Sequence, residues 1–297
     1  MATDYDTLII GTGTAGYTAA FQLAAAGQRV AVADHQPYGG TCALRGCQPK
    51  KYLVAAAEAV ERAEALVGRG IDAAPRLRWA DLQQAKHRFT DPVPEDTRAG
   101  FKAAGIDTLD GSAVFVAPDR VRVGDRLCTA AHYIIATGAL PRSLDIPGAQ
   151  LLLTSDDFLS LPRMPRRLLF VGGGYISFEF AHVALRAGAE VTILHRNRRP
   201  LQQFETDLVA ELLAASEAAG IRVVLATRGI RIEADGDGLQ VHWEDDQGPA
   251  VCPVDAAFHG AGREAALASL DLAAGGVDFN PGGVAVTASL QSVSNPR

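Results

Sequence analysis

One glycine pattern occurs twice in the chain at a fixed separation. Three glycines of the first copy have counterparts in the second, because 172 − 11, 174 − 13 and 188 − 27 all equal 161. In each copy the glycines follow a short apolar run, precede a helical stretch and lead to a second apolar run, which is the order of a β-α-β unit. The 297 residues suffice for about two domains. We therefore expect an α/β protein with two Rossmann-like, doubly wound nucleotide-binding domains.

The first copy has the complete glycine motif of a dinucleotide site. Gly11, Gly13 and Gly16 stand between an expected strand at residues 7–10 and an Ala-rich helix. Gly11 allows the tight turn, Gly13 lets the backbone approach a pyrophosphate, and Gly16 lets the helix pack closely on the strand. The amides at the start of the helix face the phosphate. Asp34 ends the next strand and is placed to accept a ribose hydroxyl.

The second copy, residues 168–195, keeps Gly172 and Gly174 but differs at two other positions. Ser177 replaces the third glycine, and His195 replaces the acid. Ser177 is small enough to keep the helix close to the strand.

The segment after the second copy is basic and carries Arg196, Arg198 and Arg199. An acid there would repel a ribose 2′-phosphate, whereas arginine accommodates it. We therefore predict NADPH in preference to NADH. The other interpretation is an ordinary solvated basic loop.

Cys42 and Cys47 lie between the copies, in a run from Gly39 to Lys50 that reads GGTCALRGCQPK. On one regular helix their Cα atoms would be roughly 8 to 9 Å apart, beyond the roughly 7 Å limit for a disulfide. We expect the backbone to bend at Gly46 and a new helix to begin near Pro49. Because a helix N-terminus lowers a thiol pKa, the pair is predicted to be a redox-active disulfide. Two free thiols are the alternative.

Composition limits the partners. The net charge of −6 argues against a nucleic acid, whose binding depends on clustered Lys and Arg. No apolar run approaches the roughly 18 residues of a membrane helix, and the first residues have no basic flank typical of a signal peptide. Four cysteines do not make a structural disulfide framework. The histidines form no cluster typical of a metal site. We expect a cytoplasmic protein that binds small molecules and lies in no membrane.

The cysteine run and both glycine turns together resemble the pyridine nucleotide-disulfide oxidoreductases, the flavoprotein family of glutathione reductase, dihydrolipoamide dehydrogenase and mercuric reductase. The resemblance covers essentially the whole chain. It implies FAD on the first copy and the nicotinamide cofactor on the second. It implies that electrons pass from NAD(P)H through the flavin to the disulfide of Cys42 and Cys47, and on to a disulfide or related acceptor. Cys42 then attacks the substrate, and Cys47 lies next to the flavin.

The resemblance assigns further roles. Gly40 and Thr41 match the positions that meet the FAD phosphates. Lys50 pairs with Glu179 beside the flavin, and Tyr175 covers the flavin until the nicotinamide displaces it. Without the resemblance, Lys50 would be a solvated helix-start lysine, and Glu179 and Tyr175 ordinary helix and core residues.

Two later stretches also fit the family. Thr137 and Gly138 belong to an A-T-G turn near FAD. The stretch 258–263 is its counterpart in the second domain and keeps only the final Gly-Arg, so that Arg263 is a weaker candidate contact to the nicotinamide cofactor.

The acceptor stays open. Glutathione reductases carry arginine where this chain has Phe21 and Gln22, mercuric reductases add terminal cysteines, and lipoamide enzymes keep the acid that His195 replaces. The missing arginine removes an anchor for a carboxylate, so glutathione is not favoured, but these departures do not decide among the branches.

The C-terminal part departs most from the family. The family's third part, which forms the homodimer interface and supplies a His-Glu acid-base pair to the partner's cysteines, has no counterpart in the sequence. An incomplete nucleotide-binding fragment without turnover is therefore the alternative function, and dimerisation, a property of the full-length family, is doubtful here. We expect an FAD-binding domain at 1–150, an NAD(P)-binding domain at 151–272, and a segment at 273–297 that returns toward the first domain.

Overall fold

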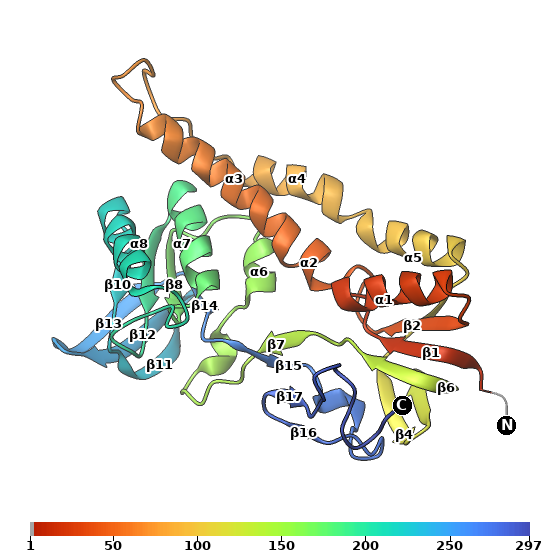
Figure 1. Cartoon of the computed structure of the whole chain (residues 1–297). Coiled ribbons are helices and arrows are strands. Elements are labelled where there is room, and N and C mark those ends of the chain that lie inside the picture. The colour runs from red at the N-terminus through yellow and green to blue at the C-terminus, as the bar shows by residue number, and fades with distance from the viewer. Residues whose placement is uncertain (1–2) are drawn as a thin grey trace. The chain divides into compact units, whose positions relative to one another are not determined.

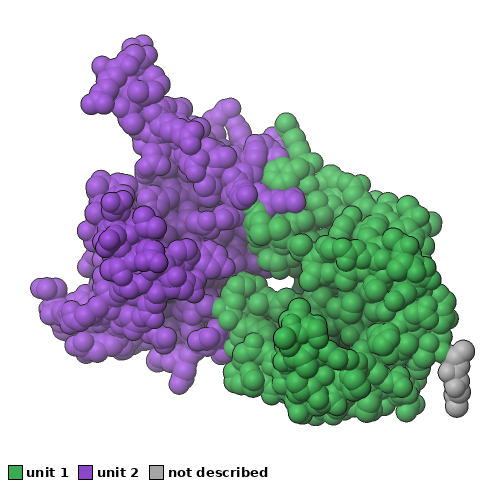
Figure 2. Space-filling view, viewed as in Figure 1, with its two compact units in different colours: residues 1–47, 88–140, 263–297 green, residues 48–87, 141–262 purple. Residues whose placement is uncertain are grey.

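The computed structural model describes residues 3–297, which form two compact units (Figure 2). Unit 1 combines three parts of the chain, ending at residue 47, spanning 88–140 and spanning 263–297. Unit 2 combines residues 48–87 and 141–262. Met1 and Ala2, which begin the segment that we interpreted as lacking a signal peptide, lie outside the described residues.

Unit 1 is built on a four-stranded parallel sheet in the order β3-β2-β1-β6. β6 also pairs antiparallel with β5, and β5 with β4, which continues the sheet as a meander. The strands are β1 (Tyr5–Ile10), β2 (Val30–Asp34), β3 (Asp107–Asp110), β4 (Ala113–Ala117), β5 (Arg120–Val123) and β6 (Arg126–Ile135). The antiparallel meander thus spans residues 113–135.

The two faces of this sheet bury different partners. Ile9, Val30 and Val32 pack with α1 (Thr14–Ala25) and with Phe101 of α5 (Val93–Ala103) on the helical face. Because side chains alternate along a strand, Leu8 and its neighbours point to the opposite face. That face packs against the meander and residues 267–284. Figure 1 shows α1 beside β1 and β2.

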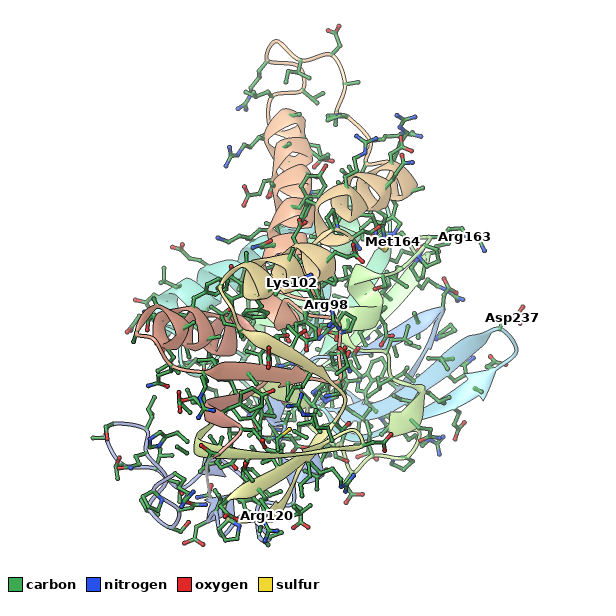
Figure 3. All side chains as sticks on the ribbon, turned by 90° about the vertical axis from the view of Figure 1, so that its right-hand side faces the viewer. Arg98, Lys102, Arg120, Arg163, Met164 and Asp237 are labelled. Atoms are coloured by element: carbon green, nitrogen blue, oxygen red, sulfur yellow. The ribbon has the colours of Figure 1, made fainter. Side chains whose placement is uncertain are left out.

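Unit 2 repeats the parallel arrangement in the order β10-β9-β8-β14. Its main elements are β8 (Arg167–Val171), α7 (Tyr175–Arg186), β9 (Glu190–Leu194), α8 (Thr206–Ala219), β10 (Arg222–Val224) and β14 (Ala256–His259). A second sheet has the order β11-β12-β13, with β11 (Arg228–Asp235), β12 (Gly238–Asp245) and β13 (Gly248–Val254). The hairpin of β11 and β12 turns at Asp237, labelled in Figure 3.

Helices cover one face of the unit 2 sheet and the three antiparallel strands cover the other. The helical face includes Leu53 and Ala57 of α3 (Cys47–Glu64), Trp79 of α4 (Trp79–Thr90) and Phe158 of α6 (Ser155–Leu159). The Trp79 indole donates to the carbonyl of Leu161 at 2.8 Å, which satisfies its polar atom inside this core. Parallel β-α-β units are thus present in both units, as expected from the repeat.

The remaining elements are short. They are α2 (Gly40–Leu44), β7 (Ala139–Pro141), β15 (Arg263–Ala265), β16 (Phe279–Asn280), β17 (Gly283–Val284) and two 3-10 turns at Ala149–Leu151 and Ala268–Leu270. Within residues 3–297, no helix combines the length and apolar character needed to cross a bilayer.

The units divide the chain differently from the domains expected at 1–150, 151–272 and 273–297. Residues 48–87 group with unit 2 because Leu53, Ala57 and Trp79 pack in its core. The return segment joins unit 1 from residue 263. Its last residue accepts a hydrogen bond from the Tyr133 amide of β6, with 2.8 Å between the amide nitrogen and the Arg297 carbonyl oxygen.

Candidate active site

The first glycine turn packs too tightly for side chains. Gly11 has φ +110°, and an added Cβ would lie 2.2 Å from the carbonyl oxygen of Ala136 at the end of β6. A Cβ on Gly16 would lie 2.0 Å from the Gly11 carbonyl oxygen. Gly13 precedes α1, and no side chain caps the helix there. The first amides of α1 are therefore available to an anion, which fits the pyrophosphate of a dinucleotide.

The helix that carries Cys42 lies directly on this turn. Gly40 begins α2 with φ +67°, and an added Cβ would lie 2.3 Å from the Cα of Gly13. The hydroxyl of Thr14, the first residue of α1, forms a hydrogen bond with the Cys42 thiol. Thr41 is exposed beside the same turn. The structure therefore brings the first glycine turn and Cys42 together.

The backbone breaks between the two cysteines, as expected. α2 ends at Leu44 and α3 begins at Cys47. Gly46 has no positive φ, and its glycine is required instead because a Cβ would lie 2.9 Å from the Thr41 carbonyl oxygen. Pro49 is buried in the first turn of α3, where its missing amide hydrogen has no helical partner to lose.

Cys42 and Cys47 are thiols in the structure, and a hydrogen bond joins their side chains. This bond, followed by partial burial, raises the pKa of the Cys42 thiol, while the hydrogen bond from Thr14 acts in the opposite direction. The expectation of a lowered thiol pKa is therefore wrong for Cys42, because the Cys47 thiol and burial outweigh the hydrogen bonds from the Thr14 hydroxyl and the Cys47 backbone. Cys47 is exposed.

Lys50 and Glu179 form the ion pair that the family resemblance implies. The Lys50 Nζ lies 2.6 Å from the Glu179 Oε1, and the two side chains are 23% and 36% exposed. Lys50 lies one turn after Cys47 on α3, and Glu179 lies one turn after Tyr175 on α7. Tyr175 and Glu179 line a cavity of about 460 Å³ between α3, α7 and α8, whose other walls are mostly apolar.

The second glycine turn repeats the first with one exchange. Gly172 has φ +113°, and its Cβ would lie 2.4 Å from the Gly260 carbonyl oxygen at the end of β14. Gly174 precedes α7 without a side-chain cap, so this turn also offers amides to an anion. Ser177 is buried, and its hydroxyl donates to the Gly172 carbonyl at 2.5 Å.

Asp34 holds the first glycine turn. Its Oδ2 accepts from the Thr12 amide at 2.8 Å and from the Thr12 hydroxyl at 2.7 Å. Its Oδ1 accepts from the Gln36 amide at 2.9 Å. The carboxylate keeps lone pairs for a ribose hydroxyl, since two oxygens offer about four acceptor sites.

The three arginines after β9 differ in their contacts. Arg199 is engaged inside its own loop, where it donates to the Thr206 hydroxyl at 2.9 Å and to the carbonyls of Gln202 and Phe204. Arg198 forms an exposed ion pair with Asp246. Arg196 makes no ion pair with any residue in the described range 3–297. Arg196 and Arg198 thus remain exposed, whereas Arg199 is half-buried and its guanidinium is engaged.

The residues that the family resemblance assigns around the A-T-G turn all belong to unit 1. They are Thr137, Gly138 and Arg263. Thr137 and Gly138 follow β6, and Gly138 accepts from the Ala266 amide at 3.0 Å. Arg263 begins β15, which pairs with β7, and its guanidinium donates to the Ala139 carbonyl. Arg263 therefore belongs to the unit that holds the first glycine turn.

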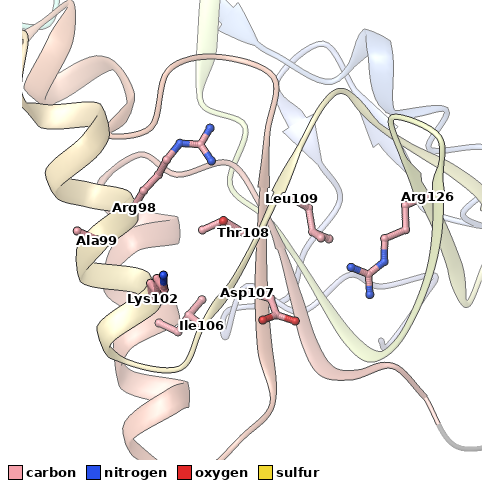
Figure 4. Close-up of a pocket in the computed structure, with 8 residues that line it drawn as sticks. All are labelled: Arg98, Ala99, Lys102, Ile106, Asp107, Thr108, Leu109 and Arg126. Carbon is pink, nitrogen blue, oxygen red and sulfur yellow. The ribbon is translucent and has the colours of Figure 1, made fainter.

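A second cavity, of about 440 Å³, lies at the open edge of β3 (Figure 4). Arg98 and Lys102 line it from α5, where Figure 3 labels both residues, and Arg126 lies across the strand. Arg98 is paired with Asp110 and lies 3.9 Å over the Tyr38 ring. No residue of the glycine turn or the cysteine pair lines this cavity, so it is separate from the candidate active site. Across residues 3–297, no group of three or more His, Cys, Asp or Glu side chains is arranged to hold a metal ion.

Sequence reasoning missed Thr14 and the strand ends at Ala136 and Gly260. The signal for Thr14 was its position: it is the first residue of α1, directly after Gly13, so its hydroxyl lies at the helix N-terminus. Ala136 ends the strand that neighbours β1, a pairing that sequence alone does not specify.

Comparison with known proteins agrees with this geometry. The chain is 34% identical to a glutathione reductase from Burkholderia cepacia over 80% of this chain and 53% of the relative. It is 30% identical to a mercuric reductase from Bacillus cereus over 99% of this chain and 47% of the relative. The chain thus spans about half the length of these curated relatives.

Solved structures and a family model add to this. The HOCl-induced flavoprotein disulfide reductase RclA from Escherichia coli, solved as a Cu(II) complex, matches with a TM-score of 0.87 and 29% identity, over 100% of this chain and 65% of that one. The model of the family described as pyridine nucleotide-disulphide oxidoreductase matches residues 5–297. The chain belongs to the pyridine nucleotide-disulphide oxidoreductase family.

Proposed function

We propose that the chain is the nucleotide-binding and thiol-bearing part of an FAD-dependent NAD(P)H:disulfide oxidoreductase of the cytoplasm. The observation that carries this proposal is the seating of α2 on the first glycine turn, through the contact of Gly40 with Gly13 and the hydrogen bond of Thr14 with Cys42. A dinucleotide on that turn would lie next to a pair of thiols.

The residues around the first turn suit FAD. The uncapped amides of α1 suit its phosphates, Thr41 is exposed at the same place, and Asp34 retains acceptor sites for a ribose hydroxyl. Thr137 and Gly138 are further candidate contacts. When bound, FAD supplies the transfer of an electron pair between a reduced nicotinamide and a disulfide.

The thiol pair can reduce a disulfide by two exchanges. The Cys42 thiolate attacks one sulfur of the substrate, so a bond to Cys42 forms, the substrate S–S bond breaks, and the first thiol leaves with a proton. Cys47 then loses its proton and attacks the Cys42 sulfur, which forms the Cys42–Cys47 disulfide and releases the second thiol. The substrate gains two electrons, and the two that the pair loses are restored from the pyridine nucleotide.

The protonation of Cys42 limits the first exchange. Because the Cys47 thiol raises the pKa of Cys42, the attacking thiolate needs a proton acceptor. This is the role of the His-Glu pair in the family's third part. Lys50 and Glu179, held 2.6 Å apart, would place a balanced pair of charges beside the flavin, and the exposed Tyr175 would cover it.

We assign NADPH to the second turn, with Arg196 and Arg198 as contacts to the 2′-phosphate. These two side chains lie at the surface after β9, and no acid stands at position 195 to repel that phosphate. Arg263 stays a weaker candidate for the nicotinamide cofactor.

For the acceptor we propose a disulfide without charged ends. Thr14 touches Cys42, and one and two turns further along α1 stand Tyr17, which is 42% exposed, and Phe21. Their rings are 4.6 Å apart, so this face of α1 is aromatic and uncharged. We expect a higher kcat/KM for lipoamide than for glutathione disulfide.

An absorption spectrum and thiol titration test the function. We expect a yellow protein that bleaches with NADPH in the absence of oxygen and gains two titratable thiols. In Cys47→Ser, flavin reduction by NADPH should persist while disulfide turnover is lost. A variant that also loses flavin reduction would contradict the role given to Cys47. A protein that takes up no FAD would favour the incomplete fragment without turnover.

A further inference from the structure

His195 joins two segments of unit 2 that are separate in sequence. It follows β9 directly and stands between the second glycine turn and the arginine segment 196–199. Its Nδ1 lies 3.1 Å from the Gly173 amide nitrogen, and its Nε2 lies 3.0 Å from the Arg199 carbonyl oxygen.

The two partners allow only one form of the imidazole. The Gly173 amide can only donate, so Nδ1 must accept, and the Arg199 carbonyl can only accept, so Nε2 must carry the hydrogen. The ring is therefore neutral with its proton on Nε2. A second proton on Nδ1 would face the Gly173 N–H and break that bond.

The first unit uses Asp34 for the same purpose. Asp34 and His195 are equivalent, as are Thr12 and Gly173, because 195 − 34 and 173 − 12 both equal 161. Asp34 accepts from the Thr12 amide at 2.8 Å and from the Gln36 amide at 2.9 Å. Asp34 thus joins two donors, whereas His195 joins a donor and an acceptor. A carboxylate at 195 could hold the glycine turn but could not donate to Arg199.

Packing keeps the ring in place. A Cβ on Gly173 would lie 2.9 Å from the His195 Cγ and 2.9 Å from the Pro200 Cβ, so the imidazole packs so closely on Gly173 that no side chain fits there. Burial lowers the pKa of His195, and the positive charge of Arg196 acts in the same direction, while the hydrogen bond with the Arg199 carbonyl opposes them. The glycine turn itself carries no titratable side chain.

We propose that His195 is a positioning residue, which holds the second glycine turn at a fixed distance from the arginine segment and thereby sets the affinity for the phosphate-bearing half of a pyridine nucleotide. The proposal rests on the proposed function in one respect, namely that the second turn receives such a nucleotide. The link itself is a property of the chain without ligand.

The first test needs no nucleotide. Amide hydrogen exchange at Gly173 should be slow in the wild type and in His195→Asn, because an asparagine amide can both accept and donate. In His195→Leu, exchange at Gly173 should become faster, while His132→Leu, at an exposed position of unit 1, should leave it unchanged. Equal exchange in the wild type and His195→Leu would overturn the proposal.

The second test measures binding of NADP+ by calorimetry at about pH 7.5. Losing both hydrogen bonds in His195→Leu should weaken binding roughly tenfold, whereas His195→Asn should stay within about threefold of the wild type. His195→Asp should bind more weakly than His195→Asn, because it leaves the Arg199 carbonyl unpaired and adds a negative charge. The folded state of each variant is checked by thermal unfolding.

The third readout is pH dependence, which a purely structural role would not produce. As the pH falls through the pKa of His195, which burial holds below 6.5, the wild type should lose affinity faster than His195→Asn, because only the imidazole takes up a proton. The phosphate of the ligand titrates equally in both and cancels in the comparison. If the wild type binds no pyridine nucleotide, the proposed function fails while the exchange test still decides the role of His195. If it binds and His195→Leu binds equally well, the present inference fails.

Discussion

At the scale of single residues, a glycine can be required by its backbone angle or by the close approach of a neighbouring backbone. Gly40 and Gly68 distinguish these two reasons. Their φ angles are similar, +67° and +74°. A Cβ on Gly40 would lie 2.3 Å from the Cα of Gly13, whereas a Cβ on Gly68 would meet nothing within 4 Å. Only Gly40 is therefore required by close approach as well as by backbone angle.

Gly68→Ala should cost about 1–2 kcal/mol through its left-handed backbone alone. Gly40→Ala should cost more, because overpacking adds a further roughly 1–3 kcal/mol. It should also reduce FAD uptake, since the helix that carries Cys42 must move away from the glycine turn. Urea unfolding and flavin content after reconstitution measure both effects. Equal losses in the two variants would contradict the close contact.

Two substitutions are expected to shift the pKa of the Cys42 thiol in opposite directions. Cys47→Ala removes the largest cause of its raised pKa, so alkylation of Cys42 should begin at a lower pH than in the wild type. Thr14→Val removes a hydrogen bond that lowers the pKa, so alkylation should begin at a higher pH. Mass spectrometry of the peptide containing Cys42 separates it from Cys128 and Cys252. Shifts in the same direction in both variants would contradict the assigned contacts.

At the scale of elements, the two β-α-β units place their small residues differently. In one unit the glycine is on the helix, and in the other it is at the end of the neighbouring strand. Unit 1 has Gly16 on the helix and Ala136 at the strand end, whereas unit 2 has Ser177 and Gly260. The strand ends are equivalent, since the Ala136 amide donates to Ile10 and the Gly260 amide to Val171, each at 2.8 Å. A Cβ on Gly260 would lie 1.9 Å from the Ser177 Oγ.

A double-mutant cycle tests this exchange. Gly260→Ala alone should destabilise unit 2 by roughly 1–3 kcal/mol through overpacking. Adding Ser177→Gly should recover part of that loss, even though glycine within a helix costs about 1 kcal/mol on its own. The free energies of unfolding give the coupling between the two sites, and additive effects would rule out the contact.

The sequence predicted the helices and strands better than it predicted which of them pack against one another. The repeat specified two β-α-β units because glycines and apolar runs at this fixed spacing suit a strand, a tight turn and a helix in that order, and few folds besides require it. The bend between Cys42 and Cys47 followed from helix geometry. The assignment of α3 to unit 2 did not follow, because the apolar face of Leu53 and Ala57 would suit any sheet face, and only the fold decides which one it covers.

For the site, the sequence and the resemblance named residues, but the contacts between those residues needed the fold. The ion pair of Lys50 and Glu179 came from family resemblance, since no local pattern links positions so far apart in sequence. The use of His195 as a link could not be derived, because the tautomer and partners of an imidazole depend on the tertiary position of Gly173 and Arg199. The raised pKa of Cys42 likewise depends on the contact with Cys47.

At the scale of the whole molecule, two half-buried histidines make the stability of unit 2 depend on pH. Burial is the main cause that lowers the pKa of His182 and of His195 from 6.5, and nearby arginines add to it. The unfolded chain therefore binds more protons than the folded chain in the range from about 6.5 down to the folded pKa values, so stability falls as pH falls through that window. The carboxylates of Asp4 and Asp255, with pKa values below 3.8, act only in stronger acid.

We expect the urea midpoint of unit 2 to be lower at about pH 5.5 than at about pH 7.5. The double variant His182→Gln/His195→Asn should show a smaller difference, because neither replacement titrates. Tryptophan fluorescence reports this unit, since Trp79 and Trp243 both lie in its cores. An unchanged pH dependence in the double variant would exclude these two histidines as its source.

Unit 1 takes its final residues from the C-terminal end of the chain, and Leu270, Leu272 and Val277 share a core with Leu8 and Ala31. On the ribosome, residues 141–262 emerge as one continuous stretch before those side chains are made. One apolar face of β1 and β2 therefore stays uncovered until the return segment, residues 263–297, has been translated. Unit 1 thus starts to be synthesised before residues 141–262 and completes its core only after they have emerged.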